Sequence, residues 1–299
     1  MESTQAILTS ATAETIGTES NARDRSIGDI IRDTRNLSAE QVEAILAEQR
    51  RSGSRFGEAA IALGFANVDD VLFALSQQFH YPYASVEKRE FNPELVALNQ
   101  PFSKQAETFR ALRSQIVMRL CGEGDARHAL AIVSADQSDG KTFFAANLAV
   151  VLAQLGGRCL LVDADMRNPR QHEVFKIGNN VGLSSVLSGR AEAKVIQQVE
   201  SVPSLFVLPC GNRPPNPVEL VERPAFGLLM RELVTKFDHV IVDTPAAIHG
   251  SDAAVIAARC GAALVLARKN ASKIGSLQDL VATLSTGPAK LAGVVLNEY

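Results

Sequence analysis

Three short segments of the chain carry the residue types that handle phosphate groups and a divalent cation. The first, residues 135–142, follows an apolar run at 129–133 and ends in Gly140-Lys141-Thr142. Glycine lets backbone N–H groups turn inward around a phosphate. Lysine can reach the β- and γ-phosphates, and a threonine hydroxyl can ligate magnesium.

This segment departs from the usual pattern G-x-x-x-x-G-K-[ST], because Ala135 stands where the first glycine is expected. A helix over 142–155 would add the positive end of its dipole to the phosphate site. The alternative is an ordinary helix that begins beside a solvated Lys141. The segments that follow favour the phosphate loop.

Aspartates close two further apolar runs. Asp163 and Asp165 come at the end of residues 159–162, and Asp243 at the end of residues 240–242. Residues two apart on a strand share a face, so a divalent cation would relieve the repulsion between Asp163 and Asp165. Asp243 would help to place the metal or a water. Aspartates that cap turns are the alternative for all three.

In this order, at strand ends, the segments predict nucleotide-dependent phosphoryl transfer with ATP and Mg²⁺. The expected catalytic residues are Lys141, Asp163, Asp165 and Asp243. Magnesium is expected on Thr142, Asp163 and Asp165, directly or through water. Such a set suffices in principle, because phosphoryl transfer needs mainly positioning and charge neutralisation.

Composition narrows the class of protein. The chain has 299 residues, of which 46% are hydrophobic, and a net charge of −3, so nonspecific nucleic-acid binding is not expected. No apolar stretch approaches the roughly 18 residues that span a bilayer, and no secretory signal is expected. The four cysteines are too far apart for a zinc site or a C-x-x-C pair, and Cys159 and Cys260 lie in or beside apolar runs. Buried thiols in a reducing cytosol are therefore expected.

The N-terminal part contains an internal repeat. Residues 1–24 are polar and expected to be disordered, whereas residues 25–84 hold two copies 29 residues apart, with Gly28 aligned to Gly57 and Gln49 to Gln78. Each copy is expected to be a short helix pair. In the first, a helix over 38–50 would begin at Ser38 as N-cap with Gln41 at its third position; in the second, a helix covers 67–79. Residues 85–102 are expected to be a linker.

From residue 103 the pattern is α/β. Strands are expected near 129–134, 159–163, 204–208, 239–243, 262–267 and 291–296, and helices near 103–120, 142–155, 217–236, 251–259 and 276–285. Alternating strands and helices predict a mostly parallel sheet with helices on both faces, preceded by a small, mainly helical domain. Ligands of such sheets bind at the carboxyl ends of strands, where all three segments lie.

Residues 103–299 resemble the bacterial tyrosine kinases (BY-kinases) of polysaccharide biosynthesis. Residues 134–142 are similar to their Walker A element, 160–167 to Walker A′ with its D-x-D-x-R order, and 240–245 to Walker B. Residues 211–220 are similar to the family's G-x-x-P-P-N-P-x-E-L stretch. Glu107, Arg110 and Arg113 reproduce its E-x-x-R-x-x-R oligomerisation motif.

The resemblance implies a P-loop NTPase fold and a cytoplasmic tyrosine (auto)kinase that regulates polysaccharide chain length or export. It implies a homo-oligomer and a separately encoded membrane chain-length protein as partner, which would bring the chain to the inner membrane. Nucleotide contacts are implied for Asp139, Gly140, Lys141, Thr142, Arg167 and Asn297. Tyr299 is the one tyrosine of this region and the implied phosphoacceptor, with low stoichiometry expected because so short a tail has little reach.

The N-terminal repeat resembles the MshEN-type domain of type II secretion ATPases, whose R-L-G turns and distal glutamine bind cyclic di-GMP. The resemblance implies a cyclic di-GMP site at Arg55, Phe56, Gly57 and Gln78. In the first copy Ser26 takes the arginine position. A helical protein-interaction module remains the alternative.

Two other classes share these features. A ParA/MinD-like ATPase would carry a lysine early in the phosphate loop, where this chain has Asp136. A non-enzymatic cyclic di-GMP adaptor would not need Lys141, Thr142 and the three aspartates.

Overall fold

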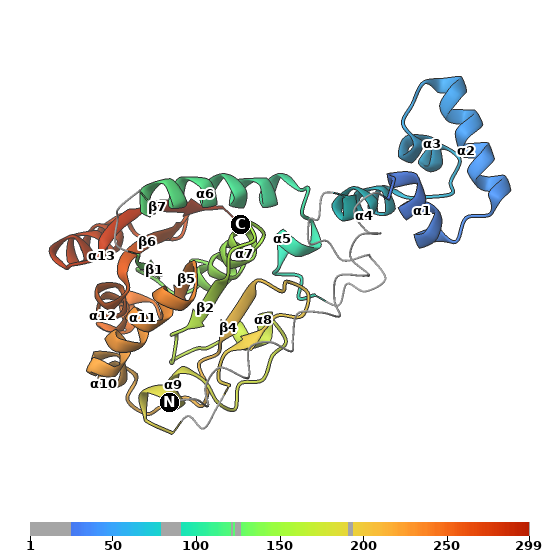
Figure 1. Cartoon of the computed structure of the whole chain (residues 1–299). Coiled ribbons are helices and arrows are strands. Elements are labelled where there is room, and N and C mark those ends of the chain that lie inside the picture. Colours follow the sequence, from blue (N-terminus) through green and yellow to red (C-terminus); the bar gives the residue numbers. More distant parts are fainter. Residues whose placement is uncertain (1–24, 79–90, 121, 123–126, 191–193, 299) are drawn as a thin grey trace, which may run out of the picture. The chain divides into compact units, whose positions relative to one another are not determined.

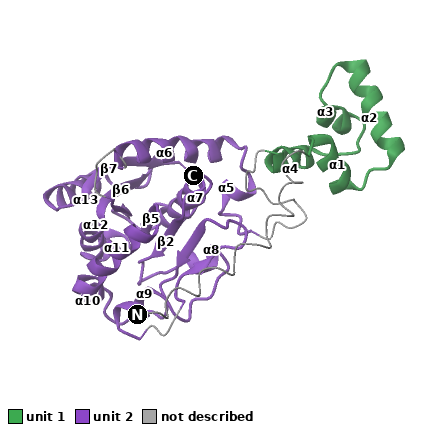
Figure 2. Ribbon diagram, viewed as in Figure 1, with its two compact units in different colours: residues 1–89 green, residues 90–299 purple. Residues whose placement is uncertain are grey.

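The computed structural model describes residues 25–78, 91–120, 122, 127–190 and 194–298 (Figure 1). The chain divides into two compact units, residues 1–89 and 90–299 (Figure 2). The tail expected over 1–24, all three tyrosines and the first part of the expected linker lie outside the described residues. No helix of the described part is long and apolar enough to cross a membrane.

The N-terminal unit consists of two helix pairs, as the repeat predicts. The first pair is α1 (Ile27–Arg35) and α2 (Ala39–Ser52), and the second is α3 (Phe56–Ala62) and α4 (Val68–Gln78). The predicted capping box is present: Gln41 N donates to Ser38 Oγ at 3.3 Å, and Ser38 N donates to Gln41 Oε1 at 2.9 Å. Helix α1 packs on α3 and α4, and α2 packs on α3, so the two copies bury their apolar faces together.

The C-terminal unit is built on a seven-stranded sheet in the order β3-β4-β2-β5-β1-β6-β7, parallel except for the β3–β4 pair. Its strands are β1 (Ala129–Ser134), β2 (Cys159–Asp163), β3 (Gln197–Gln198), β4 (Leu205–Leu208), β5 (His239–Asp243), β6 (Gly261–Arg268) and β7 (Lys290–Asn297). This confirms the predicted α/β fold class. The short β3 was not predicted, since two glutamines give no apolar pattern.

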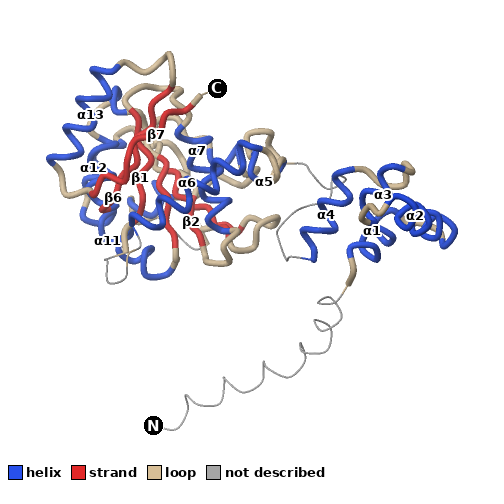
Figure 3. The backbone as a smooth tube through the Cα atoms, turned by 90° about the horizontal axis from the view of Figure 1, so that it is seen from above, coloured by secondary structure: helices blue, strands red, loops and turns tan. Residues whose placement is uncertain are grey.

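Helices cover both faces of this sheet (Figure 3). Successive strand residues point to opposite faces, so Ile132 packs with α7 while Val133 packs with α12. On one side lie α5 (Val96–Asn99), α6 (Lys104–Leu120) and α7 (Lys141–Ala153); on the other lie α10 (Pro217–Glu222), α11 (Pro224–Lys236), α12 (Asp252–Cys260) and α13 (Ile274–Thr286).

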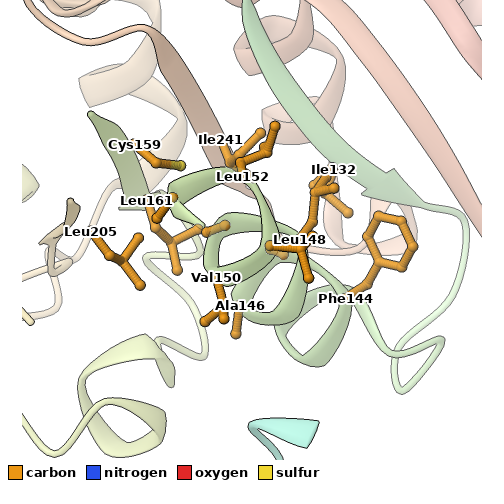
Figure 4. Close-up of a cluster of buried hydrophobic side chains, with 14 of the residues drawn as sticks. Ile132, Phe144, Ala146, Leu148, Val150, Leu152, Cys159, Leu161, Leu205 and Ile241 are labelled. Carbon is orange, nitrogen blue, oxygen red and sulfur yellow. The ribbon is translucent and has the colours of Figure 1, made fainter. Parts of the chain in front are cut away.

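Helix α7 occupies the centre of its face. Figure 4 shows its side chains Leu148 and Leu152 packed with Ile132 and Ile241 of the strands. The loop that precedes α7 is thereby anchored to the middle of the sheet. Two shorter helices, α8 (Gln171–Val174) and α9 (Leu183–Leu187), follow β2.

Two expectations for this unit are wrong. The single helix expected over 217–236 is two helices, because Pro224 has no N–H to donate and starts α11 at its first residue. The second half of the expected linker is folded: Leu95, Ala97 and Leu98 are buried, and α5 packs on α6 and α7. Neither the short α5 nor its burial shows in the local pattern.

Candidate active site

The three phosphate-handling segments meet at the carboxyl ends of adjacent central strands. Asp163 of β2 lies opposite Asp243 of β5 in the sheet register, and Asp243 lies opposite Ile132 of β1. A cavity of about 670 Å³ opens there, and Lys141, Thr142 and Asp165 are among the residues that line it. Cavities of several hundred Å³ accommodate a cofactor-sized ligand.

The loop before α7 has the conformation of a phosphate cradle. Gly140 is the N-cap of α7 with φ 92°, in the region that favours glycine, and Ser138 also has a positive φ of 60°. Ala135 is not among the described residues with positive φ, so a glycine is not needed at that place. The departure from the usual motif therefore costs the loop no backbone strain.

Lys141 is buried, and its ammonium lies among acceptors. Nζ donates to Ser134 Oγ at 2.9 Å, and that hydroxyl donates to Asp136 O at 2.7 Å. Burial lowers the pKa of Lys141, while the nearby charges of Asp243 and Asp165 act in the opposite direction. A desolvated ammonium that faces a cavity is suited to bind phosphate.

Asp139 braces the loop. It is 1% exposed; its Oδ2 accepts from Asp136 N at 3.2 Å, and its Oδ1 accepts from Ser272 Oγ at 2.8 Å. Asn297 Nδ2 donates to the Asp139 carbonyl at 3.1 Å, which joins the end of β7 to the same loop. Asp139 is not among the cavity-lining residues, and its side chain has internal partners; its nucleotide contact stays a prediction.

Asp163 and Asp165 sit together, but not as strand neighbours. Strand β2 ends at Asp163, and Asp165 lies in the turn beyond it. Asp163 is fully buried and accepts from three backbone N–H groups, those of Asp165, Arg170 and Gln171, at 3.2, 3.1 and 3.0 Å. Asp165 accepts from Arg167 N and Asn168 N at 3.1 and 2.9 Å and lines the cavity. Both carboxylates thus cap turns, and of the two only Asp165 lines the cavity.

Asp243 completes a pair of buried carboxylates. Burial raises its pKa to about 6, against a hydrogen bond from Gln171 Nε2 to Asp243 Oδ2 at 2.8 Å. Burial also raises the pKa of Asp163 well above its usual value, and the neighbouring Asp243 adds to the rise. Two carboxyl groups so placed fit a site that receives positive charge.

Magnesium would be held here by few protein ligands. No three His, Cys, Asp or Glu side chains come close enough to form a metal site by themselves in the described part of the chain. Mg²⁺ is commonly bound through one or two carboxylates together with phosphate oxygens and waters. The Thr142 hydroxyl, Asp165 and the buried Asp163–Asp243 pair fit that mode.

Arg167 lies outside the cavity lining. Its Nη2 donates to both carboxylate oxygens of the buried Asp252, at 3.0 and 3.3 Å, at the start of α12. The structure therefore gives the last residue of the D-x-D-x-R order an internal partner. Its nucleotide contact stays a prediction.

Another arginine does line the cavity, and the sequence analysis missed it. Arg170 Nη2 donates to Glu94 Oε1 at 2.5 Å, and both residues border the cavity. They are 76 residues apart in the chain, so no local pattern could pair them. The buried Gln171 was also missed, although it lies only four residues after the Walker A′-like segment 160–167.

The three residues of the oligomerisation motif have partners within the chain. Arg110 Nη1 donates to Glu107 Oε2 at 2.6 Å, and its Nη2 donates to Pro101 O. Arg113 Nη1 donates to Val151 O at 2.8 Å. The ion pair is the weak i,i+3 kind expected on a single helix.

In the N-terminal unit, the four residues of the expected cyclic di-GMP site differ in exposure. Arg55 and Gln78 are exposed and Phe56 is half-buried. Gly57 is buried, and a Cβ added there would lie 2.8 Å from Val71 Cγ1. Close packing of α3 on α4 therefore accounts for this glycine without a ligand.

Comparison with known proteins agrees with this geometry. Residues 130–299 match the family described as the CobQ/CobB/MinD/ParA nucleotide binding domain. The chain is 34% identical over 204 residues to tyrosine-protein kinase YwqD of Bacillus subtilis, which covers 68% of this chain and 85% of that protein. The kinase domain of Escherichia coli tyrosine kinase ETK superposes with a TM-score of 0.66 and 32% identity, over 71% of this chain and 82% of that one.

Some relatives are much longer. Tyrosine-protein kinase wzc of Salmonella typhi is 30% identical over 210 residues, which are 70% of this chain but 29% of that protein. The chain spans less than a third of the length of that relative.

Proposed function

Because the chain belongs to the bacterial tyrosine-protein kinases of the CobQ/CobB/MinD/ParA nucleotide-binding family, we propose that it is an ATP- and Mg²⁺-dependent protein tyrosine (auto)kinase. The observation that carries the proposal is the meeting of the buried Lys141 with Asp163, Asp165 and Asp243 at the strand ends, where Lys141 and Asp165 line one cavity.

The residues at the strand ends divide phosphate binding, metal binding and proton transfer among them in the proposed reaction. Lys141 and the N–H groups of the loop bind the phosphates. Thr142, Asp165 and Asp163 would hold magnesium, directly or through water, and Asp243 would help to place it; the metal would supply positive charge against the developing negative charge. The tyrosine oxygen forms a bond to the γ-phosphorus as the bond to the bridging oxygen breaks and ADP leaves. Asp165 is favoured over Asp163 to accept the tyrosine proton, since it lines the cavity while Asp163 accepts from three backbone N–H groups.

One pair of measurements separates the candidate activities. ATP hydrolysis and tyrosine phosphorylation are followed on the same purified chain with magnesium. A kinase transfers phosphate to tyrosine, a ParA/MinD-like ATPase only hydrolyses ATP, and an adaptor does neither.

Mass spectrometry should find Tyr299 phosphorylated at low stoichiometry, with most transfer to a partner or to water. Phosphate only on Tyr81 or Tyr83 would make the N-terminal unit the substrate.

We also propose a homo-oligomer and a membrane partner, which the family resemblance supports. Glu107, Arg110 and Arg113 on α6 would exchange partners with a second copy, and a separate membrane protein of polysaccharide chain-length control would hold the chain at the cytoplasmic side of the inner membrane. A Glu107/Arg110/Arg113 triple alanine variant should then run as a monomer in light scattering. An oligomer of unchanged mass in that variant contradicts the proposed subunit interface.

The N-terminal unit is proposed to bind cyclic di-GMP through Arg55 and Gln78, whose exposure supports this. Arginine can stack on guanine or pair with phosphate. Calorimetry of the full chain with micromolar cyclic di-GMP tests it, with an Arg55→Ala variant as control. If the wild type gives no heat of binding, the N-terminal unit is a protein-interaction module and not a cyclic di-GMP sensor.

A further inference from the structure

Gln171 contacts all three phosphate-handling segments. It is fully buried at the start of α8, and its Nε2 donates to Asp243 Oδ2 at 2.8 Å and to Thr142 O at 3.1 Å. Its backbone N–H donates to Asp163 Oδ2 at 3.0 Å. One residue thus joins the Walker B-like strand end, the first turn of α7 and the Walker A′-like strand end.

The orientation of the Gln171 amide is fixed by its neighbours. A backbone carbonyl and a carboxylate only accept hydrogen bonds, so the NH₂ group must face them and Oε1 must face away. Oε1 has no hydrogen-bond partner, and neither has Asp243 Oδ1; both atoms are buried. Buried acceptors without a donor are costly, so each of these two atoms can accept a hydrogen bond from a bound donor.

The chemistry of that donor is restricted. The phosphates of a nucleotide offer only acceptors and cannot satisfy Oε1 or Oδ1. A water can donate twice, and beside the two buried carboxylates Asp163 and Asp243 a water that ligates a cation is favoured most.

We infer that Gln171 is a positioning residue for magnesium: it fixes the orientation of Asp243 and, together with Asp243 Oδ1, accepts hydrogen bonds from a magnesium-bound water. This rests on the nucleotide and magnesium site of the proposed function but not on tyrosine as the acceptor. Gln171 itself does not line the cavity.

The test is the magnesium dependence of ADP binding in the full chain. Calorimetry gives Kd for ADP in excess Mg²⁺ and in EDTA, for the wild type and for Gln171→Met, which keeps the length of the side chain but has no amide. The Kd in EDTA divided by the Kd in excess Mg²⁺ measures how much magnesium tightens binding. This ratio should be about tenfold smaller in Gln171→Met than in the wild type, equivalent to about 1.4 kcal/mol. The Kd in EDTA should change less than threefold, because Lys141 and the loop remain.

Two further variants make the result decisive. Gln154→Met, at the far end of α7, is the matched control and should keep the wild-type ratio. If Gln171→Met does not fold, Gln171→Asn serves instead, since its amide is one methylene too short for Asp243. A purely structural role would weaken binding equally with and without Mg²⁺.

The inference is overturned by a folded Gln171 variant with the wild-type ratio, or by a wild type whose ADP binding does not depend on Mg²⁺. A wild type that shows the ratio but transfers no phosphate to tyrosine would overturn the proposed kinase activity alone.

Discussion

Asn147 ties the start of the C-terminal unit to the nucleotide-binding helix, and its removal should be measurable in both stability and binding. The residue is fully buried on α7. Its Oδ1 accepts from Ala97 N at 2.9 Å, and its Nδ2 donates to Glu94 O at 2.8 Å and to Phe143 O at 2.9 Å. The first two bonds hold residues 91–99, the segment whose Glu94 carboxylate pairs with Arg170 at the cavity.

Asn147→Ala leaves the Ala97 N–H without its partner in a buried place, since Ala97 is 1% exposed. A buried donor left unpaired costs about 1–3 kcal/mol, and the lost bond to Glu94 O adds about 0.5–1.5 kcal/mol. The bond to Phe143 O is local to the helix and adds little. We expect the free energy of unfolding of the C-terminal unit to fall by about 2–4 kcal/mol, a large part of the ~5–15 kcal/mol of a typical domain.

Urea denaturation measures the loss, and limited proteolysis locates it. Cleavage within residues 91–99 should become faster in Asn147→Ala, and the Kd for ATP should rise because Glu94 no longer holds Arg170 in place. The control is Asn99→Ala, whose amide donates to Asn92 O inside the same segment. A fall of less than about 0.5 kcal/mol in Asn147→Ala, with unchanged cleavage, would refute the anchoring role, given the cost of an unpaired donor.

Three other changes have expected outcomes. Lys141→Met should weaken ATP binding at least about tenfold, from the loss of a charge-assisted hydrogen bond, and keep the circular dichroism of the wild type; wild-type affinity in calorimetry contradicts this. Asp243→Asn should stabilise the nucleotide-free protein more at pH 8 than at pH 5. Burial raises the pKa of Asp243 to about 6 in the folded protein, whereas the pKa is about 4 in the unfolded chain. The wild type therefore loses stability as the pH rises from about 4 to about 6, and the variant, whose amide is uncharged, does not. An equal effect of Asp243→Asn in urea melts at both pH values contradicts this. Gly57→Ala should cost the N-terminal unit about 1–3 kcal/mol by crowding Val71, and Gly57→Ala with Val71→Ala should recover part of it; a single variant of wild-type stability rules the crowding out.

The strands and the cradle could be predicted because their information is local. An apolar run such as residues 129–133 must be buried on both faces, and its successor Gly140-Lys141-Thr142 has a conformation set by its own residue types. The capping box at Ser38 and Gln41 is equally local, and it is confirmed. The break at Pro224 was in principle readable, since proline favours the first turn of a helix.

The polar contacts that hold the site together could not be predicted in the same way. Asp139 meets Ser272 across 133 residues and Arg167 meets Asp252 across 85. Such partners are set by the order of strands in the sheet, which no single segment contains. The sequence therefore predicts nucleotide contacts for Asp139 and Arg167 from their types, but it does not reveal the internal partners that both side chains have.

Gln171 links the local sequence pattern to the long-range contacts. Its position soon after β2 can be read from the sequence, but its contacts depend on the strand register that sets Asp163 opposite Asp243. Two carboxylates side by side and fully buried require donors, and the nearest chain must supply them. Once the parallel order of β2 and β5 is known, an amide is expected in the segment that covers their ends, and the sequence 163–175 offers two amide side chains, Asn168 and Gln171. Asn168 lines the cavity, whereas Gln171 is buried, so the choice between them follows from burial alone.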